Sequence, residues 1–264
     1  SSARLFLSAY CIFAALLVVD RLSIFGLTVL DDTNLEFAKI LSAGSVFMLC
    51  FLTVLAIFAL FCLPLLFSAI RFYRSTATDE GYLTFTLPVK TEQIIFSKLL
   101  VALIWEAATA LLAIVLGVLF FMSFDVRSTL EVLQLFPESF FRNISEYPFW
   151  GACFAEFLVA LPLCATHGIL QSYSAISIGQ ACGRHKLLAS IGIYIGMQFA
   201  VSFLSQMLTV PVMFASFRST DTSLRILQDT FFLSMALNLL LIAGLLVVQF
   251  LLCRYFLKKK LNLS

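Results

Sequence analysis

Few residues of this chain have side chains that could carry out chemistry. Glu106 and Glu156 lie within long apolar stretches, and the two histidines are His167 and His185. Metalloproteases of the H-E-x-x-H type need two histidines on one helix, and haem-binding bundles need paired histidines on facing helices. Neither pattern occurs here, and no Ser/His/Asp arrangement is recognisable. We therefore predict that the chain is not an enzyme and has no catalytic, metal-binding or cofactor-binding residue.

Glu106, Glu156 and His167 nevertheless need an explanation, because they interrupt stretches that are otherwise apolar. A carboxylate near the centre of a lipid bilayer costs about 3 kcal/mol, so such a residue is retained for a reason. We expect these side chains to form hydrogen bonds with polar side chains of neighbouring helices. Contact with a transported substrate is the alternative.

The sequence also lacks an ATP-binding loop and a recognisable cysteine motif. An ATP-binding loop of the G-x-x-x-x-G-K-[ST] type needs a Gly followed by Lys, and none of the 11 glycines has that neighbour. Any ATP and Mg²⁺ must therefore be bound by a partner. The seven cysteines form no C-x-x-C pair and no loop framework, so we expect neither a zinc site nor a set of disulfides.

The amino-acid composition indicates a membrane protein rather than a soluble one. Of the 264 residues, 61% are hydrophobic and 12% are charged. Soluble domains usually have about 45–50% apolar and about 25% charged residues. A soluble fold of this size would expose large apolar patches, whereas a bilayer can surround them. The net charge of +2 indicates no nucleic-acid partner.

The apolar residues are grouped into six stretches long enough to cross a membrane. A helix needs about 20 apolar residues to span about 30 Å of hydrocarbon. We predict an all-α polytopic membrane protein whose single transmembrane domain covers residues 1–264. The predicted spans are residues 5–24, 46–70, 95–122, 152–178, 187–210 and 231–256.

The distribution of Lys and Arg predicts the orientation. With six spans and a cytoplasmic C-terminal tail, the N-terminus is cytoplasmic too, and 11 of the 17 basic residues lie inside. These residues are Arg4, Arg71, Arg74, Lys90, Lys98, Arg184, Lys186, Arg254, Lys258, Lys259 and Lys260. The chain starts at Ser1 without a Met, so we expect a native N-terminal stretch ahead of the numbered sequence.

Two of the predicted outer connections have recognisable patterns. Residues 123–149 carry Leu130, Leu133, Phe136 and Phe140 near helical spacing, among charged residues. That pattern predicts a short amphipathic helix on the outer membrane interface. Residues 211–230 begin with a proline, and we expect a broken, partly re-entrant element there.

The longest predicted cytoplasmic connection, residues 71–94, is the most informative. We expect Thr91 to cap a helix that starts at Glu92, whose carboxylate favours the positive end of the helix dipole. Lys98 is expected to extend toward the inner headgroups. Before this helix, Asp79-Glu80 predicts the start of a short amphipathic helix that Pro88 ends.

This connection resembles a known family. The run from Asp79 to Lys98, DEGYLTFTLPVKTEQIIFSK, is similar to the first cytoplasmic loop of ABC type-2 transporter permeases. Residues 175–192, AISIGQACGRHKLLASIG, resemble the short inner loop between the fourth and fifth spans of that family. The similarity extends over the whole numbered chain. One departure is the start, where the family usually has a cytoplasmic interfacial helix and this chain has four residues.

The resemblance implies a division of labour. Two permease chains pair in the plasma membrane of a bacterium, each docks on a separate ATPase subunit, and the inner loops transmit the ATPase movement. An ordinary solvated loop that caps two helices is the alternative interpretation of residues 71–94. The residues that the resemblance assigns to ATPase coupling are Asp79, Glu80, Gly81, Tyr82, Leu83, Leu87, Pro88, Gly183, Arg184 and His185.

The implied activity is outward transport of an amphipathic or hydrophobic cargo, such as a peptide, toxin, antibiotic or lipid-like molecule. Large apolar side chains of the second and fifth spans could line a cargo cleft, although each could equally face lipid or pack against a helix. These residues are Phe47, Phe51, Phe58, Phe61, Met197, Phe203 and Met207. The rival functions are a non-transporting structural or regulatory membrane subunit of an ABC complex and an ATP-independent carrier or channel. A neighbouring gene for an ABC ATPase would identify the ABC class.

The predicted orientation can be tested by labelling single cysteines in a variant that lacks the seven native ones. A cysteine at Ser219 should react with a membrane-impermeant thiol reagent in intact cells, because residues 211–230 are predicted to lie outside. A cysteine at Thr91 should react only after the cells are permeabilised. The opposite pattern would invert the orientation and remove the argument for ATPase docking on residues 71–94.

Overall fold

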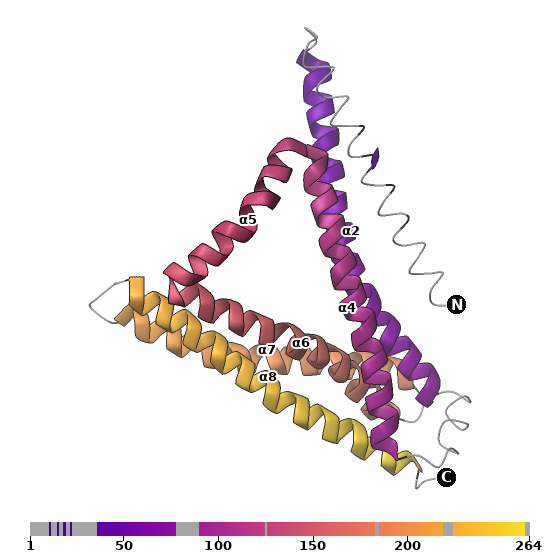
Figure 1. Ribbon diagram of the computed structural model, residues 1–264. Helices are drawn as coiled ribbons and strands as arrows, with labels where there is room; N and C mark the ends of the chain where they lie inside the picture. The colour runs from indigo at the N-terminus through magenta and orange to yellow at the C-terminus, as the bar shows by residue number, and fades with distance from the viewer. Residues whose placement is uncertain are drawn as a thin grey trace. The chain divides into compact units, whose positions relative to one another are not determined.

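The computed structural model describes residues 36–77, 90–124, 126–182, 185–218 and 224–261, together with isolated helical positions at Cys11, Ala15, Val18, Val19 and Leu22 (Figure 1). Long α-helices and short connections make up these residues, which contain no strand. The helices are α2 (Glu36–Ala77), α4 (Thr91–Phe124), α5 (Val126–Glu146), α6 (Pro148–Gly179), α7 (Lys186–Arg218) and α8 (Leu224–Leu261).

Four of these helices are long and apolar enough to cross a membrane. The qualifying segments are 30 or 31 residues long, which corresponds to about 45 Å of helix. They are Thr91–Phe120, Phe149–Gly179, Lys186–Ala215 and Gln228–Lys258. The all-helical fold of the described residues and the presence of helices long and apolar enough to cross a membrane are therefore confirmed, and these segments correspond to the last four predicted spans.

The structure gives less information on the first two predicted spans. Apart from the isolated positions near the N-terminus, residues 5–24 lie outside the described residues. Residues 46–70 lie within α2, a helix of 42 residues, and among its described side chains the stretch Phe47–Ala56 forms a shorter apolar segment. The total of six spans remains a prediction.

The helices group into two compact units. The first contains residues 1–67 and 104–142, and the second contains residues 68–103 and 143–264. Both α2 and α4 contribute a segment to each unit. The expected single domain over residues 1–264 remains a prediction.

In the second unit, α6 is the central helix and packs against both α7 and α8. Its segment from Ile169 to Ser177 is buried along its whole length. Helices α6 and α7 approach each other closely at Gly179, where a Cβ atom would lie 2.7 Å from both the Cα and the backbone N of Ser190. Only glycine fits at this crossing without displacing backbone.

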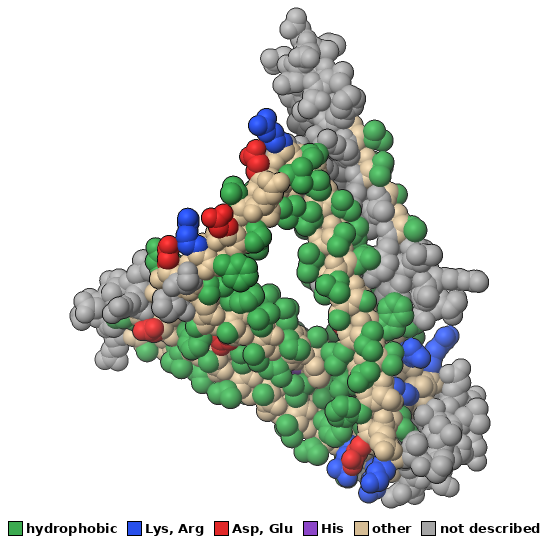
Figure 2. Space-filling model, viewed as in Figure 1, with side chains coloured by type: hydrophobic (Ala, Val, Ile, Leu, Met, Phe, Trp, Pro, Cys, Tyr) green, Lys and Arg blue, Asp and Glu red, His purple; other side chains and the backbone are tan. Residues whose placement is uncertain are grey.

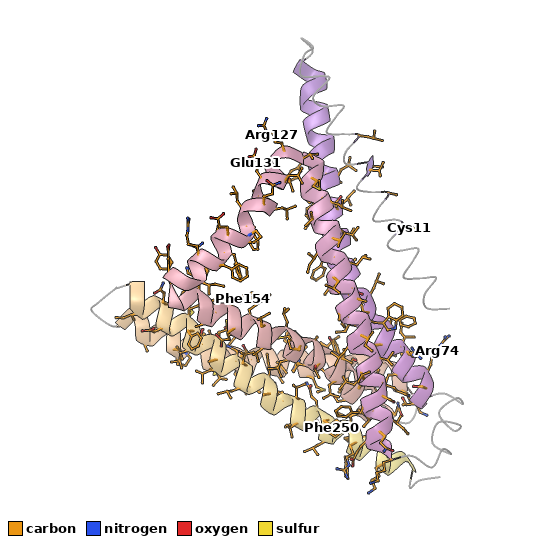
Figure 3. The ribbon with its side chains drawn as sticks, in the orientation of Figure 1. Cys11, Arg74, Arg127, Glu131, Phe154 and Phe250 are labelled. Atoms are coloured by element: carbon orange, nitrogen blue, oxygen red, sulfur yellow. The ribbon has the colours of Figure 1, made fainter. Side chains whose placement is uncertain are left out.

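Helix α5 confirms the helix predicted within residues 123–149. Charged side chains gather along one side of it, where Arg127 and Glu131 form an ion pair of 3.3 Å (Figures 2 and 3). On another face, the rings of Phe136 and Phe140 stack with their centroids 5.4 Å apart. The position of this helix at the outer interface remains a prediction.

The expectation that Pro211 ends a helix was wrong, because α7 continues through it to Arg218. Pro64, Pro137 and Pro162 likewise lie inside α2, α5 and α6. A proline removes one backbone hydrogen bond, whereas ending the helix in an apolar medium would leave several backbone groups without partners. In the rest of the predicted element, residues 219–223 lie outside the described residues, and residues 224–230 form the start of α8.

The close approach of α6 and α7 predicts the effect of alanine at two glycines. We expect Gly179→Ala to destabilise the protein by about 1–3 kcal/mol, because the new methyl group meets backbone atoms of Ser190. The matched control is Gly192→Ala, where a Cβ would meet nothing within 4 Å and alanine should preserve or raise stability. Thermal unfolding of the detergent-solubilised variants measures both effects. A Gly179→Ala variant as stable as Gly192→Ala would contradict the close packing.

Candidate functional site

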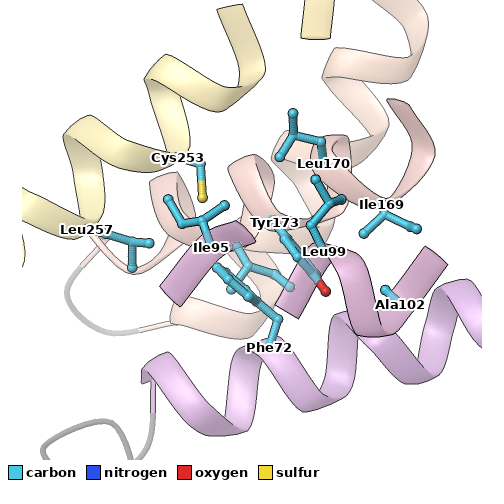
Figure 4. Packing of buried hydrophobic residues seen from close by; sticks show 10 residues of the cluster. Phe72, Ile95, Leu99, Ala102, Ile169, Leu170, Tyr173, Cys253 and Leu257 are labelled. Carbon is cyan, nitrogen blue, oxygen red and sulfur yellow. The ribbon is translucent and has the colours of Figure 1, made fainter. Parts of the chain in front are cut away.

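Four helix ends meet at one end of the second unit. The last turns of α2, α6 and α8 and the first turns of α4 bury a common apolar cluster (Figure 4). At its centre the rings of Phe72 and Tyr173 stack with centroids 4.0 Å apart and planes 10° from parallel. The cluster consists of Phe72, Ile95, Leu99, Ala102, Ile169, Leu170, Tyr173, Ile176, Cys253 and Leu257.

Lys98 joins α4 to the end of α2 within this region. Its amine donates a hydrogen bond to Ser75 Oγ and lies 5.4 Å from the centroid of the Phe72 ring. The hydroxyl of Tyr173 donates to the Lys98 carbonyl at 3.3 Å. The expected extension of Lys98 toward the headgroups remains a prediction. A hydroxyl acceptor and the face of an aromatic ring, both supplied by the end of α2, hold the amine beside that helix.

Two further contacts join the same helix ends. Gln180, just after α6, donates from Nε2 to Thr76 Oγ1 at 2.9 Å. Arg254 of α8 and Glu92 of α4 form an ion pair of 2.8 Å, with each side chain partly exposed. These contacts and those of Lys98 form what we call the basic-end clamp, which consists of Phe72, Ser75, Thr76, Glu92, Lys98, Tyr173, Gln180 and Arg254.

The start of α4 differs by one residue from the expectation. Lys90, not Thr91, is the N-cap, because its carbonyl accepts hydrogen bonds from the backbone N–H groups of Gln93 and Ile94. Its own N–H donates to Gln93 Oε1 at 3.2 Å, which is half of a capping box. Glu92 remains in the first turn, where its charge suits the helix dipole as expected.

Most of the predicted coupling residues cannot be compared with the structure. Asp79, Glu80, Gly81, Tyr82, Leu83, Leu87, Pro88, Gly183 and Arg184 lie outside the described residues. His185 is described and exposed, and its carbonyl accepts a hydrogen bond from the Ala189 N–H at the start of α7. The basic-end clamp nevertheless includes residues of both helices that flank residues 78–89. Within the predicted connection, residues 71–94, α2 continues to Ala77 and α4 begins at Thr91.

The predicted cargo-cleft residues fall into two groups. Phe47, Phe51 and Phe58 are exposed on one face of α2 in the first unit. In the second unit, Phe203 and Met207 are exposed on α7, and Met197 is half-buried with its sulfur 3.8 Å from Ser174 Oγ. The side chain of Phe61 lies outside the described residues. A cleft formed by the two groups remains a prediction.

The ionisable residues of the apolar stretches differ in their burial and in their hydrogen-bond partners. His167 of α6 contacts Gln249 of α8, with 3.2 Å between the two Nε2 atoms. Glu106 is half-buried on α4. Glu156 is only 8% exposed, yet neither carboxyl oxygen has a hydrogen-bond partner among the described residues. The expected hydrogen bond is therefore present for His167 and missing for Glu156 within the described part of the chain.

Sequence analysis missed several polar pairs between helices. Gln171 of α6 donates to Gln198 of α7 at 3.0 Å, and Asn238 of α8 donates to Thr209 of α7 at 3.0 Å. Such pairs hold membrane helices together, because hydrocarbon offers no alternative partner. The signal was present as Gln and Asn within apolar stretches, but it did not identify the partners.

Comparisons of the chain with protein-family models, with characterised proteins and with solved structures found no match. The described residues contain no group of three or more His, Cys, Asp or Glu side chains placed to hold a metal ion. The candidate site is therefore defined by the basic-end clamp and by the buried Glu156.

Two substitutions of Tyr173 test the clamp. Tyr173→Phe keeps the stacked ring and removes the hydroxyl, which donates to the Lys98 carbonyl and also bonds to the Ser68 side chain, so we expect a loss of about 1–2 kcal/mol. Tyr173→Ala removes a ring that is only 2% exposed, and we expect a loss of about 3–5 kcal/mol. Thermal or denaturant unfolding in detergent measures this difference. Equal losses for the two variants would show that the ring is not the main contact.

Proposed function

We propose that this chain is the membrane-spanning permease subunit of an ATP-driven ABC exporter. In this proposal two permease chains pair, separate ATPase subunits bind ATP and Mg²⁺, and residues 78–89 dock on an ATPase. The observation that supports it best is the basic-end clamp, which fixes the helix on each side of that connection to α6 and α8.

The physical argument concerns the transmission of force. A loop can pass a movement to the membrane only if its two ends are attached to elements that move with it. Thr76 lies at the end of α2 and bonds to Gln180, while Glu92 lies at the start of α4 and pairs with Arg254. A displacement of residues 78–89 would therefore act on α6 and α8 as well as on α2 and α4.

The proposed cargo is amphipathic or hydrophobic, moved outward. Long apolar helices with few charged residues favour such a molecule over a strongly hydrated one. The rival functions, a structural subunit or an ATP-independent carrier, require no ATPase that responds to the cargo. The presence of a dedicated ATPase therefore separates the proposal from an ATP-independent carrier, and stimulation of that ATPase by cargo separates it from a structural subunit of an ABC complex.

The test is purification of the tagged chain from the membranes of its own cells. We expect an ABC ATPase to co-purify and to hydrolyse ATP faster when cargo is present. Glu80→Arg and Tyr82→Arg should weaken the association by about tenfold or more, equivalent to about 1.4 kcal/mol, while membrane insertion is unchanged.

The matched control is Glu131→Arg, the same charge reversal at an exposed position of α5. It should leave both the association and the ATPase activity unchanged. Full association and full stimulated activity in both loop variants would rule out docking through residues 78–89.

A further inference from the structure

Glu156 is a buried acid without a partner. It lies on α6, seven residues after the start of the candidate span at Phe149, which corresponds to about 10 Å along the helix. Both carboxyl oxygens are buried and accept no hydrogen bond from the described residues. An ionised carboxylate in that position would carry a large desolvation cost unless a cation paired with it.

No ion pair or hydrogen bond of Glu156 is present among the side chains that the structure describes. Helix α6 packs against α7 and α8, and the sequence has no charged residue at positions 187–217 or 230–252. Glu156 lies on the same face of α6 as His167, eleven residues later, and His167 contacts α8 through Gln249. The other titratable side chains of α6–α8 and of the adjoining end of α5 are Arg142, Glu146, Cys153, Cys164, Tyr173, Lys186, Tyr194, Arg218, Arg225, Asp229, Cys253, Arg254, Tyr255, Lys258, Lys259 and Lys260. Of these, the side chains of Arg218, Arg225, Lys259 and Lys260 lie outside the described residues.

A second unpartnered atom on the same pair of helices is also an acceptor. Gln249 of α8 is 1% exposed, and with its Nε2 facing His167 its Oε1 has no partner. Among the described residues, the buried side-chain atoms without a hydrogen bond are this oxygen and the two oxygens of Glu156. Beside a carboxylate, the most effective hydrogen-bond donor is positively charged.

We propose that Glu156 is the binding site for the ammonium group of an amphipathic amine. The amine binds as the cation, the carboxyl group releases its proton to water, and the carboxylate pairs with the ammonium. The apolar part of the same molecule is accommodated by the surrounding apolar helices. This inference rests on the proposed export function for its biological role, because it specifies the class of cargo, but binding itself requires no ATPase.

The experiment uses the full chain in lipid nanodiscs and a dansyl-labelled alkylamine as the probe. The N-acetylated, neutral form of the probe is the matched ligand, and empty nanodiscs correct for partition into lipid. We expect saturable binding of the amine alone, with about one proton released for each amine bound in weakly buffered solution near neutral pH. Glu156→Gln should weaken binding by about tenfold or more and abolish the proton release.

Two controls make the outcome specific. Glu106→Gln removes an acid of a different candidate span, on α4, and should leave binding and proton release unchanged. The folding of Glu156→Gln is checked by thermal unfolding, and the infrared carbonyl band of a protonated carboxylic acid should be present in the unmodified protein and lost in this variant. Loss of that band does not depend on ligand binding, so it tests the neutral state of Glu156 separately.

Three results would overturn the assignment. They are equal amine affinity in the unmodified protein and Glu156→Gln, equal binding of the neutral probe, and equal proton release by sodium chloride alone. Co-purification of an ATPase without amine binding would reject this site and leave the proposed function intact. Amine binding without any ATPase would instead support the site and reject the exporter proposal.

Discussion

In the hydrocarbon of a membrane, every backbone N–H and C=O group must find its partner within the protein. Helices α4, α6, α7 and α8 satisfy this constraint by remaining helical over their whole apolar length. The same constraint explains why Pro162 and Pro211 lie inside helices. One lost hydrogen bond costs less than the several unpaired groups that a helix end would expose. The other features of the structure are contacts between such continuous helices.

Polar side chains supply much of the specificity of those contacts. In lipid the apolar residues gain little by choosing one neighbour over another, whereas an amide or hydroxyl group needs a particular partner. Pairs such as Gln171 with Gln198 and Asn238 with Thr209 therefore fix which faces of α6, α7 and α8 meet. Gly179 adds a steric condition, because it allows α6 and α7 to approach where any larger residue would separate them.

The basic-end clamp combines both kinds of contact at the place where function is proposed. The stack of Phe72 and Tyr173 gives it an apolar centre, and the bonds of Lys98 and Gln180 surround that centre. Such an arrangement can keep the ends of α2 and α4 attached to α6 and α8 under load. Glu156 is the opposite case, because this buried polar group has no partner among the described residues.

The sequence by itself determined the class of the protein and much of its helical structure. Apolar length is a local property, so it predicted the four described membrane-spanning helices, and the spacing of Leu130, Leu133, Phe136 and Phe140 predicted α5. The tertiary structure alone decided which polar groups meet. Lys98 binds Ser75, and Gln180 binds Thr76 across 104 positions, so neither contact can be recognised from a local pattern. The missing partner of Glu156 follows for the same reason, because a hydrogen bond depends on where other helices place their side chains.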